Sequence, residues 1–179
     1  VFSSGAESEH AAWAARFLGG VDLIDEDSGE IAAVLAAVPA TEPAFSRFLG
    51  EAKTWVSVTP VVLPGWDDPG GLRKRLMAIR DSREQARLLD RLADRREALV
   101  RKAIRQAGLS DELAFEARIE IRETGFLAGI GRAIDYAVPQ HLARSPRLHV
   151  RLEWPRPVRG PLCIGSGRFT GLGLFVRAP

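Results

Sequence analysis

The stretch GSGRFTGLGLF, residues 165–175, places four glycines within nine residues, around a single arginine and directly ahead of an apolar run. Glycine adopts backbone conformations that other residues avoid, and it allows another group to approach the main chain closely. Because Arg168 is basic, we expect that group to be anionic. Loops of this kind bind dinucleotides, nucleotide phosphates or RNA backbones, so the stretch alone leaves three classes of ligand open.

Short strands are expected on both sides of this loop, over residues 160–164 and 172–177. Upstream, residues 149–154 alternate between apolar and polar side chains, which predicts a half-buried strand that Pro155 and Pro157 end. The apolar face of this strand holds Val150, Leu152 and Trp154. Its polar face holds His149, Arg151 and Glu153.

The middle of the chain supplies two more predicted strands and a long helical region. Residues 113–122 alternate in the same way and predict another half-buried strand. Residues 55–63 are rich in β-branched side chains and predict a strand with Pro60 at a sheet edge or a bulge. Between these two, residues 72–107 carry two apolar stripes at helical spacing, and Gly108 ends the helical region.

In order from residue 55, the elements are strand, long helix, strand, an irregular or helical crossover over residues 125–146, strand and strand. That crossover is long for a structureless connection, so we expect a function or a short helix within it. The order is the βαββαβ outline of an α+β, ferredoxin-like (RRM-like) fold. We therefore predict one ferredoxin-like domain over residues 53–179, with the glycine-rich loop before or within its last strand.

The acidic N-terminal segment, residues 1–52, lies outside that unit and is a candidate end of a preceding domain with short α/β structure of its own. We expect a short helix over residues 9–18, an acidic turn over 22–28 and a helix over 41–51. The apolar run at 31–38 predicts a buried strand, although its alanines leave a helix open.

Charge is strongly segregated along the chain, although the net charge is only +2. Residues 1–51 hold nine acidic and two basic residues, a net charge of −7. Residues 70–107 hold twelve basic and five acidic residues (+7), and residues 140–179 hold seven and one (+6). Such segregation is expected of a protein that binds a polyanion. The alternative is that the arginines reflect coding bias and solvated helix faces.

Several classes of protein are excluded by composition and spacing. No run approaches the roughly 18 apolar residues of a membrane span, and the first residues lack a signal-peptide pattern, so we expect a soluble cytoplasmic protein. The single cysteine, Cys163, cannot form an intrachain disulfide and is interpreted as a small buried hydrophobe. The acidic turn lacks the ligand spacing of a calcium loop, and the adjacent Asp67 and Asp68 are interpreted as structural. We predict neither a metal nor a cofactor.

Two of the three ligand classes of the glycine-rich loop can then be set aside. A dinucleotide-binding fold carries its glycines after the first strand, whereas here they come last. A Walker loop needs Gly-Lys-Ser/Thr, which the sequence lacks. A sheet-borne loop beside an arginine-rich surface suits single-stranded or hairpin RNA better than a mononucleotide.

Six segments in this order carry a resemblance to one family. They are TPVVLPG at 59–65 followed by Asp67 and Asp68, KAIRQAGL at 102–109, HVRL at 149–152, GPL at 160–162, GSGR at 165–168 and GLGLF at 171–175. Over roughly residues 50–179 the chain resembles the subunit of subtype I-U (I-G) CRISPR systems that fuses a Cascade backbone subunit to a CRISPR-repeat endoribonuclease. The glycine-rich stretch resembles the signature loop of the repeat-associated mysterious protein (RAMP) superfamily.

The resemblance implies a ferredoxin-like RAMP domain that binds the repeat-derived part of CRISPR RNA, assembles with other Cascade subunits and cleaves the repeat without a metal. Two departures from the family pattern bear on cleavage more than on binding: Phe169 stands where a histidine commonly follows the loop arginine, and the arginine-rich residues 78–98 form an insertion. The alternatives are a non-catalytic structural Cascade subunit that grips the guide RNA, and an unrelated ferredoxin-like ligand-binding domain.

Repeat cleavage of this kind activates a 2′-hydroxyl against the neighbouring phosphate and needs a general base and cations. His141 ranks first as the catalytic histidine because it lies in the irregular crossover, with Tyr136 as its partner. His149 is the second candidate, since its strand face could present it to RNA. A plain surface or interface role is the alternative for both histidines.

The candidates for RNA binding lie in the glycine-rich loop, on one strand and on the long helix. In the loop, Arg168 could grip a phosphate or form a salt bridge within the domain, and Phe169 could stack on a base or fill the core. The helix arginines could line an RNA channel or be a solvated face. The full set is Gly165, Gly167, Arg168, Phe169, Gly171, Gly173, Arg151, Arg101, Lys102 and Arg105.

Overall fold

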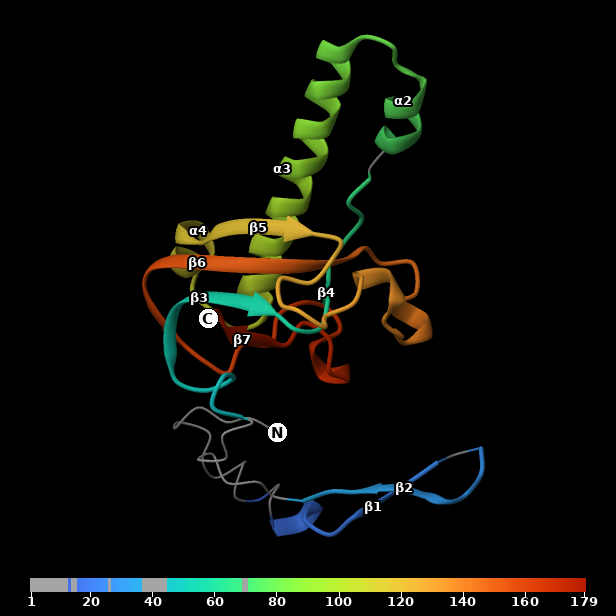
Figure 1. The fold of residues 1–179 in the computed structure, drawn as a ribbon, viewed down its shortest axis with the longest axis vertical. Helices are drawn as coiled ribbons and strands as arrows, with labels where there is room; N and C mark the ends of the chain where they lie inside the picture. The colour runs from blue at the N-terminus through green and yellow to red at the C-terminus, as the bar shows by residue number, and fades with distance from the viewer. Residues whose placement is uncertain (1–12, 14–15, 26, 37–44, 69–70) are drawn as a thin grey trace.

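The computed structural model describes residues 13, 16–25, 27–36, 45–68 and 71–179. Its centre is one antiparallel sheet, in the strand order β5, β6, β3, β7, with β4 beside the start of β6 (Figure 1). The strands are β3 (Glu51–Ser57), β4 (Val61–Val62), β5 (Arg118–Arg122), β6 (Arg147–Arg159) and β7 (Phe175–Arg177).

The topology is that of a split βαβ unit. Because β3 and β5 are both antiparallel to β6, they run parallel to each other, and β6 lies between them. The connection from β3 to β5 runs through β4 and the helices, as in the first half of a ferredoxin-like fold. The predicted α+β, ferredoxin-like class is confirmed. Among the described residues, however, the return from β6 to β7 carries only the 3₁₀ turn η5 (Arg168–Thr170) in place of the second helix.

The predicted strand at residues 55–63 is two strands, β3 and β4, with Pro60 in the break between them. Val56 pairs with Arg151 and Val61 pairs with Leu148, so five steps along β3 and β4 match three along β6. The two extra residues make the irregularity that Pro60 predicted, because proline cannot donate to a ladder.

β6 continues past Pro155 and Pro157, so the prediction that these prolines end the strand is wrong. Thr54 of β3 pairs with Glu153 and Ala52 pairs with Val158, so four residues of β6 stand opposite one residue of β3. Both prolines fall within this bulge, where no ladder hydrogen bond is required of them. The strand therefore bends and resumes its pairing beyond them.

Helix α3 (Ser82–Gln106) is the long helix that the apolar stripes predicted, and α2 (Leu72–Ala78) precedes it. The side chain of Asp81 accepts a hydrogen bond from the Arg83 N–H at the start of α3, at 2.8 Å. No described helix is both long enough and apolar enough to cross a membrane.

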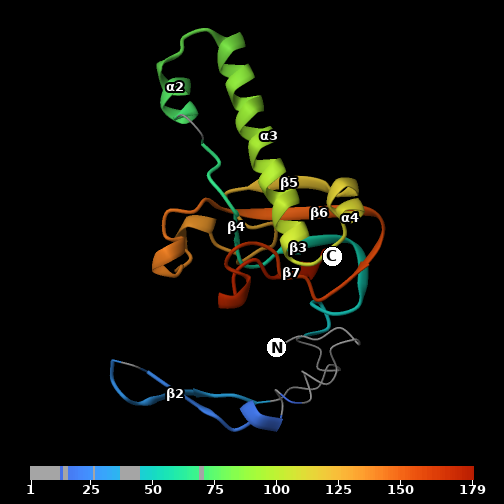
Figure 2. The same cartoon turned by 180° about the vertical axis from the view of Figure 1, so that it is seen from behind.

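α3 buries two separate apolar stripes. Its C-terminal half packs on the sheet through Leu99, Val100, Ala103 and Ile104. Its N-terminal half projects beyond the sheet (Figures 1 and 2), and there Leu88 and Leu92 pack with Leu76 of α2 and with Ile79. The outer end of α3 therefore depends on α2, and not on the sheet, for its buried surface.

The predicted strand at residues 113–122 begins only at Arg118, because residues 111–116 form the helix α4 (Asp111–Glu116). The Ser110 hydroxyl accepts a hydrogen bond from the Leu113 N–H at 3.2 Å, and Asp111 and Glu112 lie in the first turn, where carboxylates stabilise a helix. Phe115, which alternation placed on the buried face, is 82% exposed as a result.

The N-terminal segment differs from its prediction in three places. Of the acidic turn predicted at residues 22–28, residues 22–24 form a strand instead. The run at 31–38 contains the strand β2 (Ile31–Val34), which pairs with β1 (Asp22–Ile24) as a two-stranded hairpin, but both strands are exposed and not buried. Of the helix predicted at 41–51, residues 41–44 lie outside the described residues, Phe45 is in a 3₁₀ turn and Glu51 already begins β3. Trp13 and residues 16–18 are helical, and the rest of the run 9–18 lies outside the description.

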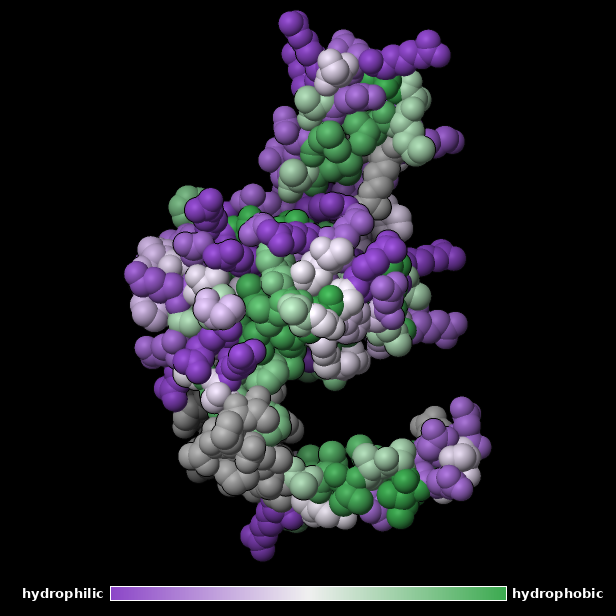
Figure 3. Space-filling view, viewed as in Figure 1, coloured by the Kyte–Doolittle hydropathy of each residue, from purple (hydrophilic) through white to green (hydrophobic). Residues whose placement is uncertain are grey.

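The face of the sheet opposite α3 is shown in Figure 3, where a hydrophobic strip runs through the middle and hydrophilic side chains flank it. By register, Glu120 of β5 lies beside Arg151 of β6, and Arg122 lies beside His149. Glu120 and Arg122 form an ion pair, and Arg151 lies 3.9 Å from Glu153. The predicted polar face of β6 is therefore partly neutralised by carboxylates on the same surface.

Candidate functional site

The glycine-rich loop lies against β4 and the residues that precede it. The Ser166 N–H donates to the carbonyl oxygen of Val62, and the Gly173 N–H donates to that of Pro60, both at 2.9 Å. The Thr59 hydroxyl donates to the Gly171 carbonyl at 2.9 Å. The close approach that the glycines predicted is thus, in this structure, an approach to the protein's own backbone.

Gly173 shows most clearly why the loop needs glycine. Its φ is +72°, and a Cβ there would lie 1.8 Å from the carbonyl oxygen of Ile164. At Gly165 and Gly167 the obstacles are the Val62 carbonyl oxygen, 2.8 Å from a Cβ, and the Leu172 side chain, at 2.9 Å. These three glycines therefore have a structural requirement that does not depend on any ligand.

The tip of the loop carries Arg168 and Phe169 outward. The Arg168 guanidinium carbon lies 4.3 Å from the centre of the Phe169 ring, and Nη1 donates to the Gly165 carbonyl at 3.2 Å. Phe169 is 85% exposed, which excludes the core-filling alternative. Among the described residues Arg168 makes no salt bridge. An exposed aromatic face and a cation held against it are the side chains that bind bases and phosphates in single strands.

Cys163 lies behind this tip and is partly buried, close to the prediction of a small hydrophobe. Its thiol contacts the carbonyl oxygens of Arg168, at 3.3 Å, and Leu172, at 3.5 Å. Burial raises the pKa of the Cys163 thiol, so the protonated form is favoured.

His149 is not presented on an open strand face, because its side chain is completely buried. Its Nδ1 lies 3.1 Å from the Ser57 hydroxyl oxygen, which itself accepts a hydrogen bond from the Val150 N–H at 3.0 Å. Tyr136 from the crossover covers it edge-on, with the ring centres 5.8 Å apart, and the Tyr136 hydroxyl donates to the Val58 carbonyl at 3.2 Å. The structure therefore brings together Tyr136 and His149, with Ser57 as a third member that no sequence pattern singled out.

Burial lowers the pKa of His149 below its ordinary value, and the backbone groups of Ser57 and Gly131 oppose that effect only in part. With the imidazole neutral, Nδ1 and the Ser57 hydroxyl share one hydrogen bond, whose direction depends on whether the ring proton is on Nδ1 or on Nε2. Nε2 is buried and makes no hydrogen bond of normal geometry with the described residues.

The stability of the fold is expected to fall as the pH is lowered through about 6.5, the ordinary pKa of histidine. Since the pKa of His149 is lowered in the folded protein, the unfolded chain takes up the proton first. The contribution is therefore fully present above pH 6.5 and is lost progressively below it. Urea unfolding at pH 7.5 and 5.5 measures this loss.

The matched variants for that experiment are His149→Asn and His141→Ala. An asparagine in place of His149 would keep an acceptor for Ser57 without a group that titrates in this range, so we expect most of the loss below pH 6.5 to disappear in H149N. The loss should persist in H141A. An unchanged pH dependence in H149N would show that another group is responsible.

His141 lies on the 3₁₀ turn η4 (Gln140–Leu142) and is exposed. Tyr136, its predicted partner, lies against His149 and makes its side-chain hydrogen bond to Val58. Of the two histidines, His141 alone is open to a bound molecule without a movement of the crossover.

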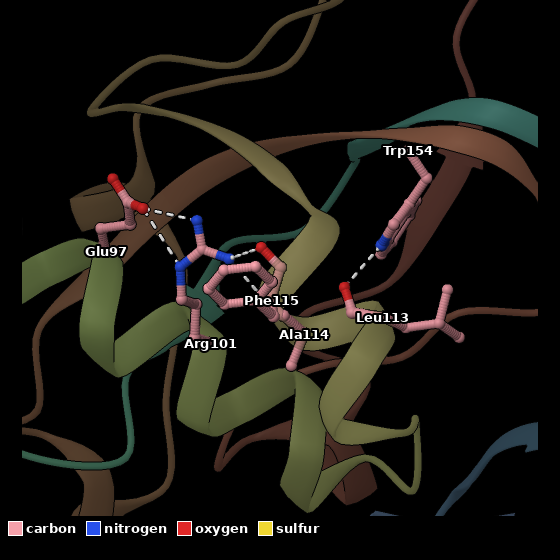
Figure 4. Close-up of polar contacts among 6 residues, drawn as sticks. All are labelled: Glu97, Arg101, Leu113, Ala114, Phe115 and Trp154. Carbon is pink, nitrogen blue, oxygen red and sulfur yellow. Dashed lines mark hydrogen bonds and ion pairs between the residues drawn. The ribbon is translucent and has the colours of Figure 1, made fainter.

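The basic residues predicted on α3 are engaged with the protein itself, as Figure 4 shows for Arg101. The Arg101 guanidinium donates to the Glu97 carboxylate through Nε and Nη2, at 3.1 and 2.6 Å, and to the carbonyl oxygens of Ala114 and Phe115 through Nη1, at 2.5 and 2.7 Å. It therefore joins α3 to the last turn of α4, whose carbonyls have no helical partner.

The other two helix candidates make weaker contacts. The Lys102 ammonium donates to the Pro64 carbonyl at 3.3 Å, and Arg105 lies 3.6 Å from Asp111 across an exposed pair. Such surface pairs add little stability, so both side chains can reorient toward a ligand. Within the described residues, no group of three or more histidine, cysteine or carboxylate side chains is arranged to hold a metal ion.

A polar pocket of about 380 Å³ was missed by sequence reasoning. Its walls come from the residues after β4, the middle of α3, the crossover and the start of β6, and they include Trp66, Arg132, Arg144 and Arg147. The one sequence signal for this pocket was the unusual share of arginines in and after the crossover. Their spacing does not show that the fold brings them to one cavity.

A comparison with protein-family models identifies the family of this chain. The family model for the CRISPR-associated protein GSU0054 family matches residues 2–177, which is nearly the whole chain. No curated protein matches the chain. No solved structure matches it either. On the strength of the family match, the chain belongs to the GSU0054 family of CRISPR-associated proteins.

Proposed function

We propose that this chain binds the repeat-derived part of CRISPR RNA as a RAMP subunit of a Cascade complex, together with the other Cascade subunits. The observation that carries the proposal is the outward-facing pair at the tip of the glycine-rich loop, Arg168 stacked on an 85% exposed Phe169. Membership of a CRISPR-associated family makes RNA the natural polyanion for that pair. The segregation of positive charge toward the C-terminal half supports the same assignment.

The loop suits a single strand more than a duplex. A base can stack on Phe169 while the next phosphate lies within reach of the Arg168 guanidinium, and both side chains project from a backbone held by hydrogen bonds to β4 and to Pro60. Gly165, Gly167, Gly171 and Gly173 then act by shaping the loop, which is a different role from direct contact with a phosphate.

Replacing Arg168 or Phe169 with alanine is expected to weaken binding of a cognate repeat RNA by roughly tenfold or more, since base stacking and a phosphate contact are each worth about 1–3 kcal/mol. Fluorescence anisotropy with a labelled repeat at several salt concentrations measures the loss. For R168A, the slope of log affinity against log salt concentration should also become shallower by about one.

The control is Arg156→Ala, which removes the same charge from an exposed site where Arg156 pairs with Glu112 and Glu116. We expect R156A to bind like the parent. Equal losses for R156A and R168A would mean that overall charge, and not the loop tip, determines the affinity.

We also propose that the subunit cuts the repeat, with His141 as the general base, because it is the exposed histidine of the crossover. In that case H141A should lower the single-turnover cleavage rate by about a hundredfold with little change in RNA affinity. H149N, made at a buried site, serves as the matched control and should cut at close to the parental rate.

The second candidate function is a non-catalytic Cascade subunit. It is favoured by the burial of His149 and by the placement of Tyr136 against it, since these two candidates for proton transfer are then unavailable to RNA. If the parent protein binds the repeat tightly but does not cut it, alone or within the assembled complex, the structural role is the correct one.

A further inference from the structure

The pocket of about 380 Å³ lies on residues that the RNA-binding proposal does not use. Trp66 and the two aspartates after it form one wall, and Arg96 of α3 lies beside them. The crossover supplies Arg132 and Arg144, and Arg147 stands at the start of β6. Its volume is in the range of sites that bind a small molecule.

The charges in this pocket leave a surplus of cations. Asp67 is almost fully buried and forms an ion pair with Arg96, with the Nε to Oδ2 distance at 2.9 Å. Arg132, Arg144 and Arg147 make no ion pair with a carboxylate among the described residues. In total the lining has four arginines and three carboxylates, a net charge of +1. That charge complements one phosphodiester group.

Hydrogen bonds hold the guanidinium of Arg147 and the backbone next to Arg132 in place. The Arg147 Nη1 donates to the Tyr136 carbonyl at 2.9 Å, while its Nε is buried without a hydrogen-bond partner in the described part of the chain. Arg132 precedes the 3₁₀ turn η3 (Ala133–Asp135), which is tied to the end of β5 by the hydrogen bond from the Ala133 N–H to the Glu123 carbonyl at 2.7 Å. A guanidinium fixed in this way presents a planar fork that matches two phosphate oxygens.

The lining of the pocket also includes an indole. Trp66 is 55% exposed, whereas tryptophan side chains are highly buried on average. Its carbonyl accepts a hydrogen bond from the Arg95 Nε at 3.2 Å, so the backbone that carries the ring is tied to α3. An exposed ring in a pocket that also holds a surplus of cations can bind a nucleobase by stacking.

We propose that this pocket binds one nucleotide, with the phosphate on Arg132, Arg144 and Arg147 and the base stacked on Trp66. The nucleotide is either free or one unit of an RNA strand, since both present the same phosphate and base. The proposal does not depend on RNA binding by the glycine-rich loop.

The test uses the fluorescence of Trp66 in the full chain. Trp55 and Trp154 are buried and Trp13 is 58% exposed, so Trp13→Phe leaves Trp66 as the one tryptophan open to quenching by a ligand. The W13F protein is titrated with the four nucleoside 5′-monophosphates, the matching nucleosides, inorganic phosphate and a trinucleotide RNA. We expect saturable quenching by the monophosphates or the trinucleotide, with the nucleosides at least tenfold weaker.

The variants Arg132→Ala and Arg144→Ala, both at exposed positions, should each raise the dissociation constant about tenfold or more, and Arg156→Ala should leave it unchanged. Quenching by the trinucleotide but not by the monophosphates identifies an RNA strand as the source of the nucleotide, and comparable quenching by both identifies a free nucleotide as a competent ligand. Failure of every nucleotide to quench Trp66, or equal affinity in R132A, R144A and the parent, would overturn the proposal.

Two further comparisons test the phosphate site and the base site separately. One variant distinguishes this proposal from RNA binding by the glycine-rich loop. If nucleosides bind as tightly as monophosphates, the phosphate site is refuted. If inorganic phosphate binds as tightly as the nucleotides, the base site is refuted. Arg168→Ala is expected to bind the mononucleotide like the parent, so a loop that fails to bind RNA would leave this result intact.

Discussion

Gly173→Ala is expected to lower the free energy of unfolding by about 3 kcal/mol or more, and a large share of the protein should be insoluble at 37 °C. The left-handed conformation at φ +72° costs an L-residue about 1–2 kcal/mol. A Cβ 1.8 Å from the Ile164 carbonyl oxygen adds a clash that only the backbone can relieve. Relief would break the hydrogen bond from the Ile164 N–H to the Gly173 carbonyl, at 2.8 Å, which joins the two sides of the glycine-rich loop just before β7.

The matched control is Gly171→Ala. Gly171 has nearly the same backbone angle, φ +79°, but a Cβ there meets no atom within 4 Å. The variant should therefore lose only the conformational part, about 1–2 kcal/mol. Urea unfolding of both variants followed by circular dichroism measures the difference, and equal losses would show that the clash at Ile164 relaxes without cost.

Arg101→Met is expected to lower the free energy of unfolding by about 2–3 kcal/mol, because a half-buried guanidinium bound to one carboxylate and two carbonyl oxygens is replaced by a group that cannot donate. Glu97 and the last turn of α4 then lose their shared donor. Arg101→Lys should recover only part of the loss, since an ammonium lacks the fork that reaches both partners.

The same variants decide whether Arg101 also binds RNA. If its role is to join α3 to α4, R101K should bind the repeat RNA like the parent under conditions where it is folded. If R101K is folded but binds the repeat RNA more weakly than the parent, Arg101 contacts the RNA, as its position on a basic helix predicted.

The ferredoxin-like class was predictable because it rests on features that short windows of sequence carry. Alternation over residues 149–154 and the apolar stripes of α3 each report a buried face directly. The strand order depends mainly on the position of β6 between β3 and β5. The predicted βαββαβ outline includes this arrangement. The boundary between residues 52 and 53 stays a prediction.

The errors arose where two local signals compete. The alternation of residues 113–116 predicts a strand, whereas Ser110 before them can cap a helix. The helix α4 forms because it has this cap and because its Leu113 carbonyl accepts a hydrogen bond from the Trp154 indole N–H at 2.8 Å (Figure 4). Pro155 and Pro157 mark a strand end in most settings, but a bulge removes the hydrogen bonds that proline cannot make.

The candidate site was only partly predictable because exposure depends on distant segments. The alternation of β6 correctly separated His149 from the core face, yet Tyr136, thirteen residues earlier in the chain, covers that histidine. The polar pocket of about 380 Å³ is lined by both Trp66 and Arg147, which are brought together by the pairing of β4 with β6. No window of sequence contains both.

The long strand β6 has a consequence for the order in which the domain can fold. β3, β4 and β5 all pair with it, and its contact between Trp55 and Leu152 closes a loop of almost a hundred residues. A ribosome must therefore synthesise most of the domain before any of these three strands finds its neighbour, while α2 and α3 can pack as soon as they emerge. We expect slow folding with an early helical hairpin, and a period during synthesis in which three unpaired strands need protection from aggregation.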